Sequence, residues 1–254
     1  MKIAALQMDI VWENRAANYR KAEQGAARAV ENGADLIVLP EMFATGFSMN
    51  TAVTAEPQNG ETVTFLKNLA RTLKVGIIGG FVKALSDGRA QNCAVAVDRE
   101  GVEIAVYAKS YLFSYMGEDK YHVAGDGVRV FEFDGLRCAC FICYDLRFPE
   151  LFRQVCRETD AAFVIASWPA DRAPHWKTLL PARAVENQFY VVGVNRVGNG
   201  HGLRFQGDSM IVDPAGELLE AGNDVETILI ADITSKRVRE VRSAMPFLND
   251  YRGS

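Results

Sequence analysis

The chain has 254 residues, of which 49% are hydrophobic, and its formal net charge is −4 at pH 7. This length suits one large α/β domain or two small ones, with enough apolar residues for a sizeable core. An acidic chain without a basic stripe is not typical of a nucleic-acid-binding protein. Because no apolar run approaches the roughly 20 residues that cross a membrane, we expect neither nucleic acid nor membrane as a partner.

The cysteine usage indicates a reducing compartment. The odd number of cysteines, the chain length and the lack of a recognisable secretory signal ahead of Lys2 argue against a disulfide framework. We therefore expect a cytoplasmic protein. A zinc site is only weakly indicated, because no second Cys/His pair accompanies the three clustered cysteines. The five cysteines are Cys93, Cys138, Cys140, Cys143 and Cys156.

The N-terminal part of the chain alternates apolar runs with amphipathic segments. Lys2–Met8 is typical of a buried strand, and Asn14–Glu31 carries small apolar residues at helical spacing. Asn32 and Gly33 end this predicted helix, and Asp35–Pro40 contains a second strand that ends at a proline. Together these segments predict a β-helix-β unit.

The rest of the chain continues the same alternation without a linker rich in Pro, Gly or Ser. Because apolar helix faces need a sheet to cover, we expect one α/β domain over residues 1–254, with layered sheets and helices outside. In chain order, we predict a helix at Thr62–Lys74, strands at Val75–Lys83, Asn92–Asp98, Val102–Lys109, Val128–Phe133 and Leu136–Cys143, a helix at Phe148–Glu158, a strand at Ala162–Ser167, a helix at Trp176–Asn187, strands at Tyr190–Asn195, Ser209–Asp213, Leu218–Glu220 and Thr227–Ile233, and a helix near Ser235–Arg242.

Cys143 lies where an apolar strand turns into a helix whose start is marked by Pro149. A cysteine at such a turn faces backbone N–H groups and the positive end of a helix dipole. Both lower a thiol pKa, so we expect a nucleophilic thiolate. The N–H of Tyr144, the next residue, can serve an oxyanion. The alternative, a small buried hydrophobe, suits the other four cysteines well.

Glu41 and Lys109 also stand at predicted strand ends. Glu41 follows Pro40 at the carboxyl edge of its strand, where ligands bind in α/β sheets. Lys109 ends another strand and can stabilise an anion that develops on a substrate oxygen. Each has an ordinary alternative, since Glu41 can be an exposed loop carboxylate or helix cap and Lys109 a surface lysine. Their joint placement indicates a shared site.

Three segments resemble the signatures of the nitrilase (carbon–nitrogen hydrolase) superfamily and occur in the family's order and separations. Further matches, among them Gly117-Glu118, Ser167-Trp168-Pro169 and Gly207-Asp208-Ser209, extend the resemblance over nearly the whole chain. The three segments are Leu39–Phe43, Tyr107–Phe113 and Ile142–Glu150.

This resemblance implies a four-layer α-β-β-α sandwich and a Glu–Lys–Cys triad on Glu41, Lys109 and Cys143. It also implies a second active-site glutamate at Glu118, an oxyanion held by Lys109 and the Tyr144 N–H, and a homodimer. No metal or organic cofactor is needed. Within the superfamily, the chain looks most like the omega-amidases, which release ammonia from the distal amide of 2-oxo acids such as 2-oxoglutaramate and 2-oxosuccinamate.

Four side chains near these segments are candidates for substrate binding. Phe43, Tyr111 and Trp168 are candidates for an apolar wall together with Phe113. Core packing is favoured over ligand contact for these aromatic residues, except for Trp168, which directly precedes Pro169 at a strand end. Arg147 can clamp a carboxylate bidentately or form a structural ion pair. Relatives often carry histidine at the position of Tyr111, so this residue bears on the substrate.

Two other functional classes stay open. The same triad can perform related carbon–nitrogen chemistry, such as hydrolysis of nitriles, N-carbamoyl compounds or deaminated glutathione. A non-catalytic binding protein with the family fold is the second alternative. It is disfavoured because Glu41, Lys109, Cys143 and Glu118 are all present.

Overall fold

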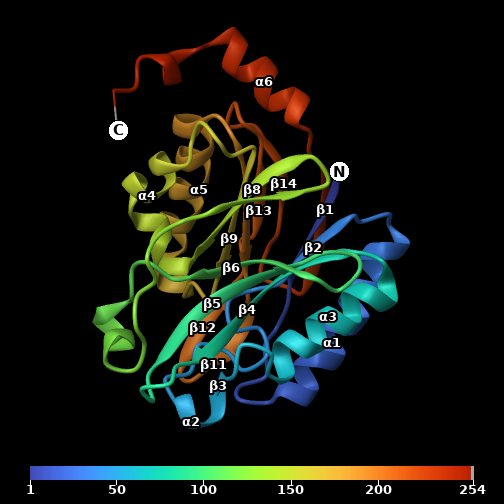
Figure 1. Cartoon of the computed structure of the whole chain (residues 1–254), viewed down its shortest axis with the longest axis vertical. Coiled ribbons are helices and arrows are strands. Elements are labelled where there is room, and N and C mark those ends of the chain that lie inside the picture. Colours follow the sequence, from blue (N-terminus) through green and yellow to red (C-terminus); the bar gives the residue numbers. More distant parts are fainter. Residues whose placement is uncertain (253–254) are drawn as a thin grey trace.

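Two large sheets form the centre of the computed structural model, which describes residues 1–252 (Figure 1). The first sheet contains β1 (Lys2–Gln7), β2 (Leu36–Val38), β3 (Ala55–Glu56), β4 (Gly76–Ala84), β5 (Ala90–Val97), β6 (Glu103–Ala108) and β15 (Thr227–Asp232). Its order is β15-β1-β2-β4-β5-β6, with β3 beside β4. The second contains β7 (Val130–Phe133), β8 (Leu136–Ile142), β9 (Ala161–Ala166), β10 (Tyr190–Asn195), β13 (Met210–Val212) and β14 (Leu218–Ala221). Its order is β14-β13-β10-β9-β8-β7.

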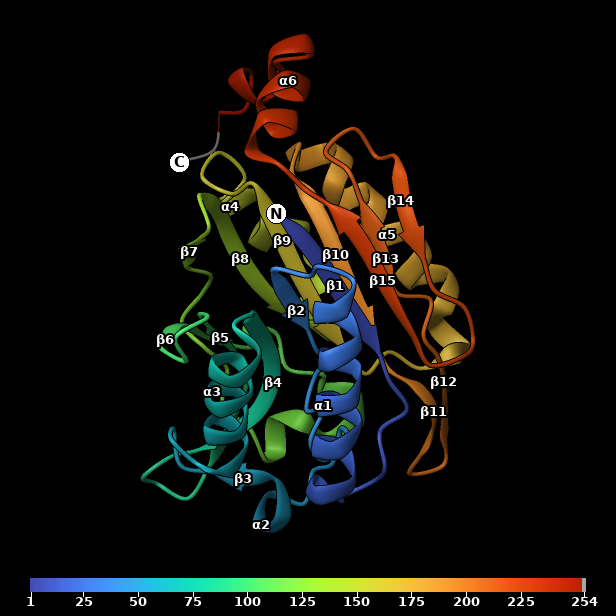
Figure 2. The same ribbon diagram turned by 90° about the vertical axis from the view of Figure 1, so that its right-hand side faces the viewer.

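Helices cover the outer face of each sheet. Helices α1 (Arg15–Glu31) and α3 (Glu61–Leu73) pack on the first sheet, and α4 (Pro149–Gln154) and α5 (Ala173–Asn187) pack on the second (Figures 1 and 2). One buried apolar cluster fills the space between the sheets, and one lies between each sheet and its helices. The expected four-layer α-β-β-α sandwich is therefore confirmed.

Strand β8 shows how the sequence creates these layers. Side chains along a strand alternate between the two faces of the sheet. Cys138, Cys140 and Ile142 therefore point into the core between the sheets, whereas Ala139 and Phe141 point toward α4 and α5. Both cysteines of this strand are buried apolar residues, as the sequence indicated.

Most predicted elements lie within a few residues of their observed bounds, and α1 begins as its sequence predicts. Asn14 caps this helix by accepting a hydrogen bond from the Ala17 N–H at 3.0 Å. The helix predicted at Phe148–Glu158 ends at Gln154, however, and a hairpin of β11 (Val197–Gly200) and β12 (Leu203–Gln206) was not predicted. The β11 strand is rich in glycine, and the β12 strand alternates apolar and polar residues over only four positions, so the signal for a strand is weak.

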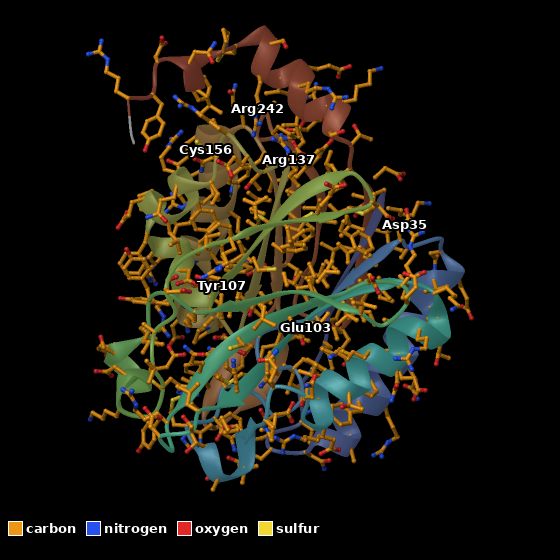
Figure 3. All side chains as sticks on the ribbon, viewed as in Figure 1. Asp35, Glu103, Tyr107, Arg137, Cys156 and Arg242 are labelled. Atoms are coloured by element: carbon orange, nitrogen blue, oxygen red, sulfur yellow. The ribbon has the colours of Figure 1, made fainter. Side chains whose placement is uncertain are left out.

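Helix α6 (Ser235–Ala244) lies beyond the end of the sheets, as both views show (Figures 1 and 2). The Arg242 guanidinium attaches it to the second half of the molecule by donating to the carbonyls of Cys156 and Thr159, each at 2.7 Å (Figure 3). Among the residues described, none of the helices combines the length and hydrophobicity needed to cross a lipid bilayer.

Candidate active site

The fold brings the four predicted catalytic side chains to one place. Lys109 directly follows β6 and Cys143 directly follows β8, while Glu41 comes shortly after β2. Glu118 belongs to a short 3-10 turn, Glu118–Lys120, in the connection to β7. Because these strands end at the same edge of the sandwich, residues far apart in the sequence become neighbours.

Glu41, Lys109 and Glu118 form one buried ion cluster. Lys109 Nζ lies 3.2 Å from Glu41 Oε1 and 3.1 and 2.8 Å from the two carboxylate oxygens of Glu118. Asn92 in β5 joins the carboxylates, since its Nδ2 donates to Glu41 Oε1 at 2.7 Å and to Glu118 Oε1 at 3.0 Å. Sequence reasoning missed Asn92, although a polar residue at the start of an apolar strand is a usable signal.

The cluster favours the charged forms of Lys109 and Glu118. Burial lowers the pKa of Lys109, but the carboxylates of Glu118 and Glu41 outweigh burial and raise this pKa above its ordinary value. Burial likewise raises the pKa of Glu118. The Lys109 ammonium, the Asn92 amide and the Phe113 N–H reverse that effect and leave the pKa below its usual range. The pair is therefore an ammonium facing a carboxylate.

Cys143 occupies a strained turn beside this cluster. Its φ of 48° lies in the left-handed region that non-glycine residues seldom adopt, and it opens the 3-10 turn Cys143–Arg147. Burial, followed by the negative charge of Glu41, raises the thiol pKa well above its ordinary value. The Lys109 ammonium and the Ser167 N–H act in the opposite direction and do not offset these effects.

The prediction that the turn lowers the thiol pKa is therefore wrong. It considered the backbone N–H groups and the helix dipole, whereas the sulfur also faces carboxylates in a buried site. A raised pKa favours the protonated thiol, which becomes a strong nucleophile once a base takes its proton. Glu41 is placed for this task, because the Ser167 N–H that faces the sulfur also donates to Glu41 Oε2 at 2.7 Å.

Asp145, which the sequence analysis did not select, holds the turn in place. Its carboxylate accepts hydrogen bonds from the Tyr107 hydroxyl at 2.7 Å, the Ile142 N–H at 2.9 Å and the Tyr111 N–H at 2.8 Å. Burial raises the pKa of Asp145 to about 6. Because Tyr107 and Tyr111 flank Lys109 in sequence, Asp145 fixes the cysteine turn relative to the lysine.

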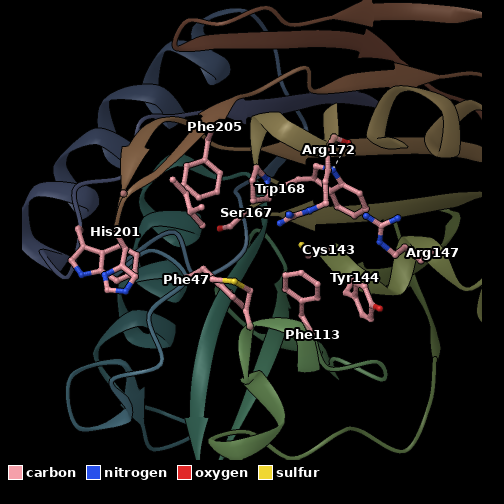
Figure 4. Close-up of a pocket in the computed structure, with 15 residues that line it drawn as sticks. Phe47, Phe113, Cys143, Tyr144, Arg147, Ser167, Trp168, Arg172, His201 and Phe205 are labelled. Atoms are coloured by element: carbon pink, nitrogen blue, oxygen red, sulfur yellow. Dashed lines mark hydrogen bonds between the residues drawn. The ribbon is translucent and has the colours of Figure 1, made fainter. Parts of the chain in front are cut away.

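A pocket opens above Cys143 and Ser167 (Figure 4). Of the predicted substrate-binding residues, Arg147 and Trp168 line it, and so does Tyr144. The Arg147 guanidinium stacks over the Trp168 ring, with its central carbon 4.6 Å from the ring centroid. The remaining lining comes mainly from aromatic residues in loops and in the β11–β12 hairpin: Trp12, Phe47, Phe113, His201 and Phe205.

The structure places Phe43 and Tyr111 outside this pocket, which corrects the prediction that they line it. Phe43 has no exposed surface and packs near Tyr19 and Phe65 in the layer between the first sheet and its helices. Tyr111 stacks on Phe148, with ring centroids 3.7 Å apart. Proximity in sequence to a catalytic motif did not determine the direction of either side chain.

The side chains that meet in the site indicate a class of reaction. Within residues 1–252, no three His, Cys, Asp or Glu side chains gather in a way that could hold a metal ion. A thiol, a buried carboxylate next to it and an ammonium are the components of nucleophilic acyl transfer. Residues 2–243 match the carbon–nitrogen hydrolase family. The chain belongs to this family.

Several relatives of this carbon–nitrogen hydrolase are amidases by name. It is 36% identical to the 2-oxoglutaramate amidase of Bacillus subtilis, over 98% of this chain and 97% of the relative. It is 38% identical to the omega-amidase YafV of Yersinia enterocolitica, over 98% of this chain and 96% of the relative. Among solved structures, a CN-hydrolase superfamily protein of Xanthomonas campestris with an arsenic adduct in its active site is 31% identical. It superposes with a TM-score of 0.92 over 100% of this chain and 98% of that chain.

Proposed function

We propose that this carbon–nitrogen hydrolase is an omega-amidase-like enzyme that converts the carboxamide of a small acidic substrate to a carboxylate and ammonia. Candidate substrates are 2-oxoglutaramate and 2-oxosuccinamate. The observation that carries the proposal is the Cys143 thiol, open to a pocket on one side and adjoining the Glu41–Lys109 cluster on the other. The names of the Bacillus and Yersinia relatives support the amide as the reacting group.

In the first half of the reaction, the Glu41 carboxylate accepts the thiol proton as the sulfur of Cys143 attacks the amide carbon. Negative charge then develops on the amide oxygen. The Tyr144 N–H stabilises it, since N–H groups at the start of a helical turn lack partners within the turn. Lys109 contributes its positive charge. Protonated Glu41 gives the proton to the departing nitrogen, which leaves as ammonia while a thioester forms on Cys143.

In the second half, a water molecule attacks the thioester carbon. Glu41 accepts a proton from this water, and Glu118 helps to orient it through the shared Lys109 ammonium and Asn92 amide. The tetrahedral intermediate collapses to a free carboxylate product, and the sulfur takes back its proton. Each turnover therefore consumes one amide and one water and leaves Cys143 as a thiol.

The pocket also supports an acidic substrate. Arg147 lines the pocket, and within residues 1–252 its guanidinium makes no salt bridge; its one side-chain hydrogen bond is with His175 Nδ1 at 3.2 Å. This leaves donors for a substrate carboxylate. Trp168 supports the guanidinium from one face, which restricts its orientation.

Ammonia release from a panel of compounds tests this proposal. The panel contains 2-oxoglutaramate, 2-oxosuccinamate, simple aliphatic amides, nitriles and N-carbamoyl amino acids. We expect the two 2-oxo acid amides to be hydrolysed with the highest kcat/KM. Activity on nitriles or carbamoyl compounds alone would instead assign the alternative carbon–nitrogen chemistry.

The nucleophile is tested separately with Cys143→Ala and Cys143→Ser. We expect both variants to lose turnover and to lose the acyl-enzyme mass that wild type shows after rapid quenching. If a variant loses activity but keeps the melting temperature of the wild-type protein, Cys143 has a chemical role and not a structural one. Full activity in Cys143→Ala would mean that another residue attacks the amide.

We also propose that the enzyme is a homodimer. Support comes from the resemblance to its superfamily and from the exposed apolar residues Val185 and Met245, which border a hollow between α5 and α6. One chain has a mass of 28.0 kDa. Light scattering should give twice this mass, and Met245→Asp should shift the protein toward the monomer.

A cytoplasmic location is proposed from the cysteines. All five are free, and four of them are buried. A reducing compartment keeps the Cys143 thiol available for attack. Fractionation of producing cells should recover the amidase activity with cytoplasmic markers.

A further inference from the structure

A second arginine, Arg172, shares the pocket with Arg147 (Figure 4). It ends the short 3-10 turn Ala170–Arg172, which directly follows Pro169. Figure 4 shows its side chain extending into the pocket toward Cys143. The two guanidinium groups therefore reach the same space from different segments of the chain.

Neither guanidinium is neutralised by the protein. Within residues 1–252, neither arginine lies within salt-bridge distance of a carboxylate, and the Arg172 side chain makes no hydrogen bond. Other arginines form salt bridges with carboxylates: Arg137 pairs with Asp160 at 2.8 Å, and Arg237 pairs with Asp213 at 2.7 Å. Partial burial and the nearby positive charge of Arg172 lower the pKa of Arg147. Two cations close to one another without a counter-ion repel.

Aromatic rings hold both groups in place without occupying their N–H donors, of which one, Nη1 of Arg147, bonds His175. The central carbon of Arg172 lies 5.3 Å from the centroid of the Phe113 ring, and that of Arg147 lies 4.6 Å from the Trp168 ring. The turn that carries Arg172 is also fixed, since the Trp168 indole N–H donates to the Arg172 carbonyl at 2.8 Å. Stacking occupies a face of a guanidinium, whereas its hydrogen-bond donors lie in the plane.

We propose that Arg172, together with Arg147, forms the subsite for the carboxylate of the substrate and that Arg172 decides between acidic and neutral amides. This inference rests on the proposed amidase function. The ligand class is a monoamide of a short dicarboxylic acid, with the amide over Cys143 and the carboxylate at the two arginines. A carboxylate matches a guanidinium bidentately and removes the repulsion between the two cations. The apolar walls of the pocket accommodate the methylene groups between the two ends.

Kinetics with matched substrates test the subsite. Succinamate and glutaramate are compared with butyramide and valeramide, which have similar length and no carboxylate. We expect Arg172→Gln to lower kcat/KM for the acidic amides roughly ten- to a hundredfold, mainly through KM, as for loss of charge-assisted hydrogen bonds. The loss for the neutral amides should be much smaller. Arg172→Lys should recover part of the loss, because it restores charge without the planar fork.

Arg239→Gln serves as the control, because Arg239 is an exposed arginine on α6, away from the pocket. It should behave like wild type on every amide. Equal losses on acidic and neutral amides in Arg172→Gln would overturn the subsite and leave the proposed amidase function intact.

A binding measurement separates the two proposals. Alkylation of Cys143 by iodoacetamide is followed by mass spectrometry with and without succinate. We expect succinate to slow alkylation in wild type and in Arg239→Gln, but not in Arg172→Gln. If no amide is turned over while this pattern holds, the carboxylate subsite stands and the assigned reaction is wrong. If succinate protects wild type and Arg172→Gln equally, the subsite is wrong.

Discussion

Asp145, which is part of the cysteine turn, connects this turn to the segment that carries the lysine. Its oxygens accept from Tyr107 Oη, the Ile142 N–H and the Tyr111 N–H. An asparagine at this position offers only one oxygen, so at least one of these donors meets an amide N–H instead. The turn would then shift relative to Lys109. Asp145 is accordingly a positioning residue.

We expect Asp145→Asn to lower kcat by about tenfold or more while KM changes little, because small misplacements of reacting groups slow the chemical step. Ammonia release at saturating amide checks this. Tyr107→Phe removes only one of the three donors and should lose less activity. An increase in KM with kcat preserved would show that Asp145 acts on substrate binding instead.

The same residue predicts a pH dependence of stability. The pKa of Asp145 is about 6 in the folded protein, above the roughly 3.9 of an unfolded aspartate, so the folded state binds this proton more tightly. Its contribution is fully present below about pH 4 and is lost as pH rises through about 6. The shift corresponds to about 3 kcal/mol at most. Denaturant unfolding from pH 4 to 7 should show this slope in wild type and in the exposed control Asp126→Asn, but not in Asp145→Asn.

Sequence reasoning located residues better than it oriented side chains. Strand ends and the family resemblance selected Glu41, Lys109 and Cys143, because backbone position places a residue at the sheet edge whatever its rotamer. The same approach misplaced Phe43 and Tyr111. Their directions depend on local turn dihedrals and, for Tyr111, on the bond from its N–H to Asp145.

Strand β4 supports the site at Gly80, where the absence of a side chain lets the backbone of Glu41 and Met42 lie close to the strand. A Cβ at Gly80 would lie 2.4 Å from the Met42 nitrogen and 2.8 Å from Glu41 Cα, both backbone atoms. Glycine therefore allows the turn after β2 to press against β4. Met42 itself adopts φ 44°, so this turn has little freedom to move elsewhere.

We expect Gly80→Ala to displace the Glu41 carboxylate and to reduce kcat by about a hundredfold. The neighbouring Gly79→Ala is the matched control. Its Cβ would meet Leu66 Cδ1 at 3.1 Å and Phe43 Cε1 at 3.3 Å, which are side-chain atoms able to adjust. Kinetics and thermal unfolding of both variants check this. Equal activity in the two variants would argue against a role for the β4 approach in holding Glu41.

Elements with a clear apolar period were predictable, and elements defined by tertiary pairing were not. The β11–β12 hairpin forms one wall of the pocket through His201 and Phe205. The His201 ring stacks on the Trp12 ring, with centroids 4.9 Å apart. Its backbone pairing depends on glycines and on contacts with residues distant in sequence. The lining of the pocket could therefore not be assembled from local patterns.

At the scale of the whole molecule, the core between the sheets is the structural feature that unites the chain. It takes side chains from both sheets, including Leu36 and Ile78 from the first and Phe163 and Ile165 from the second. The site depends on the same packing, because Glu41 and Lys109 follow strands of one sheet and Cys143 follows a strand of the other. Relative movement of the sheets would separate the base from the nucleophile. We therefore propose that residues 1–254 act as one domain.

Phe163→Ala tests this proposal. Phe163 is fully buried between the sheets, and its truncation should cost about 3–5 kcal/mol of unfolding free energy. Because both sheets contribute to this core, amide hydrogen exchange should accelerate together in β1 and β4 of the first sheet and in β8 and β9 of the second. Leu218→Ala, at an exposed position of β14, should change stability by only about 0.5 kcal/mol and leave exchange in these strands unaltered. Faster exchange confined to the second sheet would instead show that the two sheets unfold as separate units and that the chain contains more than one cooperative domain.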